Sequence, residues 1–142
     1  MKKEVMILTG AGQIGMAIAR RMGTGKKIVL GDKCMNNAEI IAQIMNNAGF
    51  DVLPMEMDLS SRSSILSLID EAQKHGEISM LVNAAGVSPS QASVKTILEV
   101  DLYGTAVLLE EVGKVIGKGG VGVTISSQSG HRMPALSPET DE

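Results

Sequence analysis

Three glycines near the start of the chain have the spacing of a turn that holds a diphosphate. Gly10, Gly12 and Gly15 follow the apolar segment 5–8 and open a segment with helical periodicity. The first glycine permits a sharp strand-to-helix reversal, the second lets phosphate oxygens approach backbone N–H groups, and the third lets the helix pack against the sheet. The helix N-terminus attracts the anion. We therefore expect a pyrophosphate to be held by Gly10, Gly12, Gln13, Ile14 and Gly15.

A carboxylate follows where a βαβ unit places the acid that binds a ribose. A second apolar segment, 27–31, ends at Asp32, roughly 20 residues after Gly10. An acid at this point accepts a hydrogen bond from the 2′-OH of an adenosine ribose. The alternative is a turn whose glycines serve only packing, with Asp32 as a solvated strand end. Because the strand, the glycine turn and the acid occur in register, we favour nucleotide binding.

Three further segments follow expected strands and could line the same site. Asp58 and Leu59 could contact an adenine ring, or Asp58 could instead cap the next helix. Residues 83–86 have small side chains, suited either to a cofactor lying over the backbone or to packing between sheet and helix. Segment 125–130 carries several serines, which are also common in turns.

The elements that position these residues alternate along the chain. Apolar segments predict strands over 5–8, 27–31, 51–57, 79–83 and 121–126. Helical periodicity predicts helices from residue 14, over 38–48, from Ser60 or Ser61 to His75, and over 94–115. The first of these helices is expected to face the core through Ile14, Ala17, Ile18 and Met22.

Strands separated by helices require right-handed crossovers, which give a parallel, doubly wound sheet between two helical layers. The expected strand order is 3-2-1-4-5, and a ligand would lie beyond the carboxyl ends of the strands, between the first and the fourth. We therefore predict a three-layer α/β Rossmann fold. Residues 1–130 would form the nucleotide-binding domain, and 131–142 a flexible tail.

Composition excludes several other classes of function. The chain has 142 residues, 44% of them hydrophobic, which suits one domain with a real core. A net charge of −3 and only two aromatic residues, Phe50 and Tyr103, argue against nucleic acid as a partner. Apolar stretches are too short for a membrane span or a signal peptide, so we expect a cytoplasmic protein. A single cysteine, Cys34, and two distant histidines predict neither a disulfide nor a metal site.

Together these segments resemble the N-terminal part of the short-chain dehydrogenase/reductase family over nearly the whole chain. The turn over residues 9–15 corresponds to the family's cofactor motif, with one residue fewer than Thr-Gly-x-x-x-Gly-x-Gly. Asp58 and Leu59 match the pair that contacts adenine. The Asn-Asn/Ala-Ala-Gly motif after the fourth strand is matched in full by Asn83, Ala84, Ala85 and Gly86.

The resemblance implies an oxidoreductase that transfers hydride between NAD and an alcohol or carbonyl substrate. Asp32 stands where the family selects NAD, because its charge would repel a 2′-phosphate, and NADP is therefore less favoured. Lys33, beside it, is expected in the same cofactor site. The family also implies a homo-oligomer, without nucleic acid or membrane as a partner.

The family's catalytic set is matched only in part. Ser127 fits the serine that hydrogen-bonds the substrate oxygen. Asp101 stands where the family has asparagine, which alters the electrostatics of the proton relay. The Tyr-x-x-x-Lys pair is absent, since the only tyrosine, Tyr103, is followed at the fourth position by Val107. We therefore expect the chain to be inactive alone.

The sequence leaves the reason for this incompleteness open. The family's last strands are also missing, which would leave the fifth strand as an open edge with apolar faces exposed. The chain could be part of a longer polypeptide, a truncated product, or a protein that relies on a partner. A catalytically silent nucleotide-binding or scaffold domain is the alternative to the enzyme.

Overall fold

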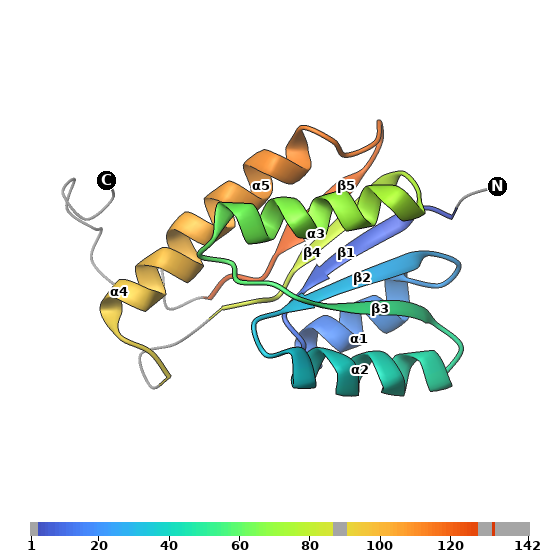
Figure 1. Ribbon diagram of the computed structural model, residues 1–142, viewed down its shortest axis with the longest axis horizontal. Coiled ribbons are helices and arrows are strands. Elements are labelled where there is room, and N and C mark those ends of the chain that lie inside the picture. The colour runs from blue at the N-terminus through green and yellow to red at the C-terminus, as the bar shows by residue number, and fades with distance from the viewer. Residues whose placement is uncertain (1–2, 87–90, 128–131, 133–142) are drawn as a thin grey trace.

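The structure, a computed structural model, describes residues 3–86, 91–127 and 132 (Figure 1). Within these residues one parallel sheet has the strand order β3-β2-β1-β4-β5. The predicted order and the doubly wound topology are confirmed. The strands are β1 (Val5–Thr9), β2 (Lys27–Asp32), β3 (Asp51–Glu56), β4 (Ile78–Asn83) and β5 (Val121–Thr124).

Helices cover both faces of the sheet. Helices α1 (Gln13–Met22) and α2 (Met35–Asn47) lie on one face, and α3 (Arg62–His75) and α5 (Thr105–Gly113) lie on the other (Figure 1). Successive side chains of a strand point to opposite faces, so β1 supplies Met6 and Leu8 to one core and Val5 and Ile7 to the other. All four are fully buried. Burial on both faces explains why the strands read as continuous apolar segments.

Helix α1 buries only part of the predicted apolar face, because Ile18 packs against the core whereas Ile14 and Met22 are exposed. Its buried residues are Gly15 and Ala19, whereas Ile14 is 61% exposed and Met22 is 50% exposed. The prediction that Ile14 and Met22 face the core was therefore wrong. Met16 and Ile18 also pack against the core. At Gly15 the helix lies so close to β1 that a Cβ would be 3.2 Å from Cδ1 of Leu8. Apolar periodicity does not report a contact of this kind.

The long helix predicted over 94–115 is present but not uniform. Helix α4 (Val94–Ile97) continues into the π-helical segment η1 (Leu98–Gly104), which α5 follows. Val100 and Leu108 are buried as predicted, but Leu102 is 42% exposed. A Cβ at Gly104 would lie 2.7 Å from Cγ of Leu59, so glycine allows η1 to pack against the loop after β3. Short π-helical segments are often found at functional sites.

Both ends of α3 follow the predicted signals. Of the two candidate caps, Ser61 is the N-cap, and its side chain accepts a hydrogen bond from the Ser64 N–H at 3.3 Å. The helix ends at His75, ahead of Gly76 with φ +155°. A positively charged side chain in the last turn of a helix interacts favourably with the helix dipole. The sequence therefore sets the length of α3 and, with it, the direction in which the chain enters β4.

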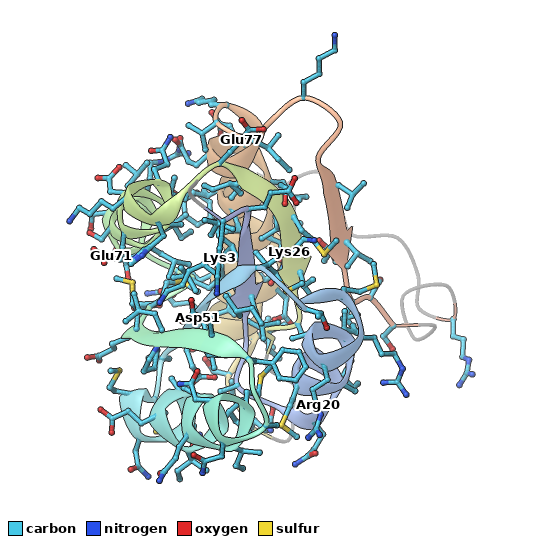
Figure 2. The ribbon with its side chains drawn as sticks, turned by 90° about the vertical axis from the view of Figure 1, so that its right-hand side faces the viewer. Lys3, Arg20, Lys26, Asp51, Glu71 and Glu77 are labelled. Atoms are coloured by element: carbon cyan, nitrogen blue, oxygen red, sulfur yellow. The ribbon has the colours of Figure 1, made fainter. Side chains whose placement is uncertain are left out.

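The amino-terminal edge of the sheet carries ion pairs. Asp51, at the start of β3, accepts from Lys27 Nζ at 2.9 Å and from Lys3 Nζ at 3.2 Å. Figure 2 shows Lys3 and Asp51 close together. The hydrogen bond from Lys27 is the largest cause that lowers the pKa of Asp51. These pairs lie at the opposite end of the strands from the predicted ligand site.

Strand β5 forms an edge of the sheet. It pairs with β4 alone among the described strands, and Val121 and Val123 are 55% and 46% exposed. Among the described strands, β5 is therefore an edge strand, and it exposes apolar side chains. Strand β5 also ends at Thr124, two residues earlier than predicted.

Candidate functional site

A pocket of about 480 Å³ lies at the carboxyl ends of the strands, where the strand order predicts a ligand site. It brings together residues from the ends of β1 to β4 that the sequence assigned to cofactor binding. These are Gly10, Gly12, Asp32, Lys33, Asp58, Leu59, Ala84, Ala85 and Gly86.

The glycine turn has the geometry that close approach of a ligand requires. Gly10 has φ +93°, and a Cβ there would lie 2.7 Å from the carbonyl carbon of Ala84. Only glycine fits this position. A Cβ at Gly12, in contrast, would meet no atom within 4 Å, although Gly12 lines the pocket. Protein packing therefore does not require glycine at position 12, whereas a ligand lying against the backbone would.

Helix α1 begins at Gln13, within this turn, and no side chain caps its N-terminus. Gly12 is the N-cap residue, and the first backbone hydrogen bond of the helix runs from the Met16 N–H to the Gly12 carbonyl at 3.1 Å. The N–H groups of the residues between them precede the helical ladder. Gln13, Ile14 and Gly15 do not line the pocket. They form the first turn of α1, where backbone N–H groups and the helix dipole attract an anion.

The Asp32 carboxylate joins two loops of the pocket. Its Oδ2 accepts a hydrogen bond from the Ala11 N–H at 2.7 Å, and its Oδ1 accepts one from the Cys34 N–H at 2.7 Å. The Gly10 N–H donates to the carbonyl of Gly31 at 2.8 Å, beside this contact. Asp32 thus fixes the glycine turn as well as presenting a negative charge at the pocket. The bond from Cys34 is local, whereas the bond from Ala11 joins residues 21 positions apart in the chain.

Asp58 is held at the pocket by the residue two positions on. Its Oδ1 accepts from the Ser60 hydroxyl at 2.7 Å and from the Ser60 N–H at 3.0 Å. The hydroxyl bond is the largest cause that lowers the pKa of Asp58, and the positive charge of Lys33 contributes. Ser61, not Asp58, caps the following helix. The Asp58 carboxylate is therefore ionised at neutral pH and lines the pocket with Lys33.

Asn83, unlike the other three assigned residues of segment 83–86, does not line the pocket. It is 1% exposed. Its Oδ1 accepts from the Thr9 hydroxyl at 2.5 Å, and its Nδ2 donates to Thr105 Oγ1 at 3.4 Å. Its carbonyl accepts from the Ile125 N–H at 2.9 Å. Asn83 therefore positions the turn after β4 by tying it to β1, α5 and the segment after β5.

A second pocket of about 510 Å³ adjoins the first and contains both assigned catalytic residues, Asp101 and Ser127. The two pockets share Ala85, Gly86 and Gln91. Asp101 comes from η1, and its Oδ1 lies 3.2 Å from the position that a Cβ on Gly86 would occupy. The turn over 84–86 therefore forms the boundary between the two pockets.

Sequence reasoning missed several residues that line the pockets. Ala11, Gly31 and Met57 are chain neighbours of assigned residues, and Thr105 follows Asp101 by one helical turn, so spacing alone could have found them. Gln91 and Asn37 carry no signal in the sequence, because their approach to the pockets depends on how loops and helices pack. The missed lining residues of the first pocket also include Thr96 and Val100, and those of the second include Thr124. Ile125 and Ser126 also line the second pocket, and they lie in segment 125–130, which was expected to line the site.

Two expected absences concern the described residues only. In the part of the chain that the structure describes, no group of three or more His, Cys, Asp or Glu side chains could hold a metal ion. No helix there has the length and apolar character needed to cross a membrane. Apart from Arg132, the expected tail over 131–142 lies outside the described residues.

The chain is similar to known short-chain dehydrogenases. The family model described as short chain dehydrogenase matches residues 4–138. A curated relative, the short-chain dehydrogenase/reductase bsc3 of Alternaria brassicicola, is 39% identical over 133 residues, which are 94% of this chain and 48% of that protein. Tropinone reductase-like 3 of Erythroxylum coca is 29% identical over 93% of this chain and 55% of its own length.

Solved structures share the fold. A short-chain dehydrogenase/reductase from Burkholderia phymatum in complex with NAD aligns with a TM-score of 0.79 and 24% identity, covering 96% of this chain and 52% of that one. A Serratia marcescens short-chain dehydrogenase/reductase aligns with a TM-score of 0.79 and 22% identity over 99% of this chain and 62% of its own. The chain spans about half the length of the curated relatives it matches. By its sequence match over residues 4–138, the chain belongs to the short-chain dehydrogenase family.

Proposed function

We propose that these residues form the cofactor-binding part of an NAD-dependent oxidoreductase that transfers hydride between nicotinamide and the carbon of an alcohol or carbonyl substrate. The observation that carries the proposal is the pair of adjoining pockets. The first pocket is lined by the glycine turn and by Asp32, and the second is lined by Ser127. Gly86 lines both pockets. Oxidoreductases of this family bind a nicotinamide cofactor, which supplies or accepts the hydride.

The residues fit such a cofactor by their chemistry. The backbone at Gly12 leaves open space for a diphosphate at the N-terminus of α1. Asp32 presents a carboxylate to a ribose hydroxyl and would repel a 2′-phosphate, which favours NAD over NADP. Asp58 and Leu59 would meet the adenine, and the turn over 84–86 would lie against the ribose on the nicotinamide side. Lys33 balances part of the negative charge at the adenosine end.

Ser127 would orient the substrate in the second pocket. Its hydroxyl can donate a hydrogen bond to a carbonyl oxygen and so stabilise the charge that develops there. We assign proton transfer to a group outside these 142 residues, because Tyr103 has Val107, not lysine, four positions on. We therefore expect the chain alone to bind NAD without turnover. We also propose that it functions in the cytoplasm, as the short apolar stretches suggest, and as a homo-oligomer, as the family resemblance implies.

A catalytically silent nucleotide-binding domain is the second candidate, and Asp101 favours it. An anion in place of the family's asparagine changes the electrostatics of the pocket that contains Ser127. The two candidates differ in one measurable property. A polypeptide that joins these residues to a Tyr-x-x-x-Lys segment should reduce carbonyl compounds if the first is correct, and should bind NAD without turnover if the second is.

Binding itself is tested at Gly12. A Gly12→Ala variant should unfold with nearly the wild-type free energy, because the added methyl meets no protein atom within 4 Å. It should bind NAD at least about tenfold more weakly in calorimetric titration, because the methyl would occupy space that phosphate oxygens need. Gly113→Ala is the matched control, since its methyl would also meet nothing within 4 Å and Gly113 lines neither pocket. Equal NAD affinity in both variants would contradict the proposal.

A further inference from the structure

Asp101 places a negative charge at the boundary between the two pockets. It is the one ionisable side chain among the described residues that line the second pocket. Its Oδ1 lies 3.2 Å from the Cβ position of Gly86, a residue of both pockets. The other charged lining residues, Asp32, Lys33 and Asp58, follow β2 and β3 at the far end of the first pocket. Among the described residues that line the two pockets, Asp101 is therefore the charged residue nearest to Gly86.

We infer that Asp101 makes this site prefer the oxidised, positively charged form of nicotinamide over the reduced, neutral form. The inference depends on the proposed function, which places the nicotinamide end of the cofactor at the turn over 84–86. The two forms differ in net charge only at the nicotinamide ring. Charges at the adenosine end act almost equally on both, whereas a carboxylate beside the ring stabilises only the cation.

The size of the preference follows from distance and exposure. A carboxylate attracts a nearby cation through its charge even while its oxygens accept other hydrogen bonds. Asp101 is exposed, so water and salt screen the interaction, which then resembles that of a surface ion pair. We expect a preference for the oxidised form of about fivefold at low ionic strength. It would favour carbonyl reduction, because hydride loss from the nicotinamide creates the cation that Asp101 stabilises.

The test compares affinities of this chain for NAD⁺ and NADH, which requires no turnover. The ratio of the NADH to the NAD⁺ dissociation constant is measured by calorimetry for the wild type and for Asp101→Asn, Asp101→Glu and Asp70→Asn. Asp101→Asn should lower the ratio by about fivefold, and 0.5 M salt should reduce that difference. Asp101→Glu should keep the wild-type ratio because it keeps the charge. Asp70→Asn removes a charge from α3, outside both pockets, and should also leave the ratio unchanged.

Two results would overturn the inference and are distinguishable from each other. If the wild type and Asp101→Asn bind both forms with the same ratio, Asp101 does not discriminate them and the proposed function stands. If the wild type binds neither form, the proposed function is wrong and the inference falls with it. Near-ultraviolet and far-ultraviolet circular dichroism of each variant verifies that the fold is retained, and the isosteric Asp101→Asn change favours that outcome.

Discussion

The carboxylate of Asp32 accepts a 2.7 Å hydrogen bond from the backbone N–H of Ala11, in the middle of the glycine turn. The residue assigned to the ribose thus also holds the loop assigned to the pyrophosphate. Its second oxygen is bound in the same way by the Cys34 N–H. Because one side chain orients both loops, changes at Asp32 should affect affinity through loop position as well as through direct contact.

Replacing Asp32 should weaken NAD binding and reduce discrimination against NADP. Asp32→Ala removes a charged acceptor, which is worth about 1.5–3 kcal/mol when hydrogen-bonded. Calorimetric titration with both dinucleotides measures the two effects. Faster hydrogen exchange of the Ala11 amide, followed by NMR, would report the loosened turn. Wild-type protein that binds NAD and NADP equally well would disprove the assigned role of Asp32.

Replacing Gly10 should destabilise the fold itself. Gly10→Ala puts a Cβ 2.7 Å from the carbonyl carbon of Ala84 at φ +93°. Backbone strain and overpacking together should lower the free energy of unfolding by about 3 kcal/mol. Urea denaturation of this variant and of Gly113→Ala provides the measurement and its control, since the methyl at Gly113 would meet no atom within 4 Å. A Gly10→Ala variant as stable as wild type would show that the turn can relax.

Replacing the N-cap of α3 should have a smaller, local effect. The Ser61 side chain accepts from the Ser64 N–H, and loss of such a cap costs about 1 kcal/mol. Ser61→Ala should therefore shift the urea midpoint downward. Ser67→Ala is the comparison, because the Ser67 hydroxyl donates to the carbonyl of Ser63 within the same helix, and its loss should leave stability unchanged or slightly higher. Equal midpoints for the two variants would exclude capping by Ser61.

Acid should weaken the ion pairs that Glu111 of α5 forms with Lys114, at the end of the same helix, and with Arg62 of α3. Glu111 pairs with Lys114 Nζ at 3.1 Å and with Arg62. The hydrogen bond from Lys114 is the largest cause that lowers the pKa of Glu111 below 4.5. A lowered folded-state pKa means that the stabilisation is complete above the unfolded value and is lost as the pH falls through the folded value.

The measurement for these ion pairs is the melting temperature as a function of pH. Between about pH 5 and about pH 3, the wild type should lose more thermal stability than Glu111→Gln, because only the wild type gains a proton at this site. Glu39→Gln changes an exposed acid that forms no ion pair with a described residue, so it should retain the wild-type slope. Parallel curves for all three proteins would contradict the prediction.

Strands β1, β2 and β4 were predictable because burial on both faces makes each of them a continuous apolar segment. The alternation of strands and helices then gave the parallel, doubly wound topology. Gly10, Gly76 and Ser61 likewise mark turns and caps through local chemistry that the sequence displays directly. The buried face of α1 was only partly predictable from apolar periodicity, because its buried residues are Gly15 and Ala19. The π-helical segment was missed for a related reason, since helical periodicity assumes 3.6 residues per turn throughout.

The candidate site was predictable where its residues stand at the carboxyl ends of strands. Gly12, Asp32 and Asp58 follow strands that end at one edge of the sheet, so topology alone brings them together. Asn83 also ends a strand, but its side chain lies beneath the turn, bonded to Thr9 and Thr105. The position of a residue after a strand predicts at which end of the sheet it lies. Whether its side chain reaches the pocket depends on packing.

The π-helical segment makes this helix sensitive to single-residue insertions and deletions. Each of its wider turns holds an extra fraction of a residue, so removal of one residue between Leu98 and Gly104 would restore the ordinary α-helical register. Everything on the amino-terminal side of the deletion would then rotate about the helix axis relative to α5. In evolutionary terms, a one-codon change here can alter which side chain faces Gly86 while leaving the strands and the glycine turn intact.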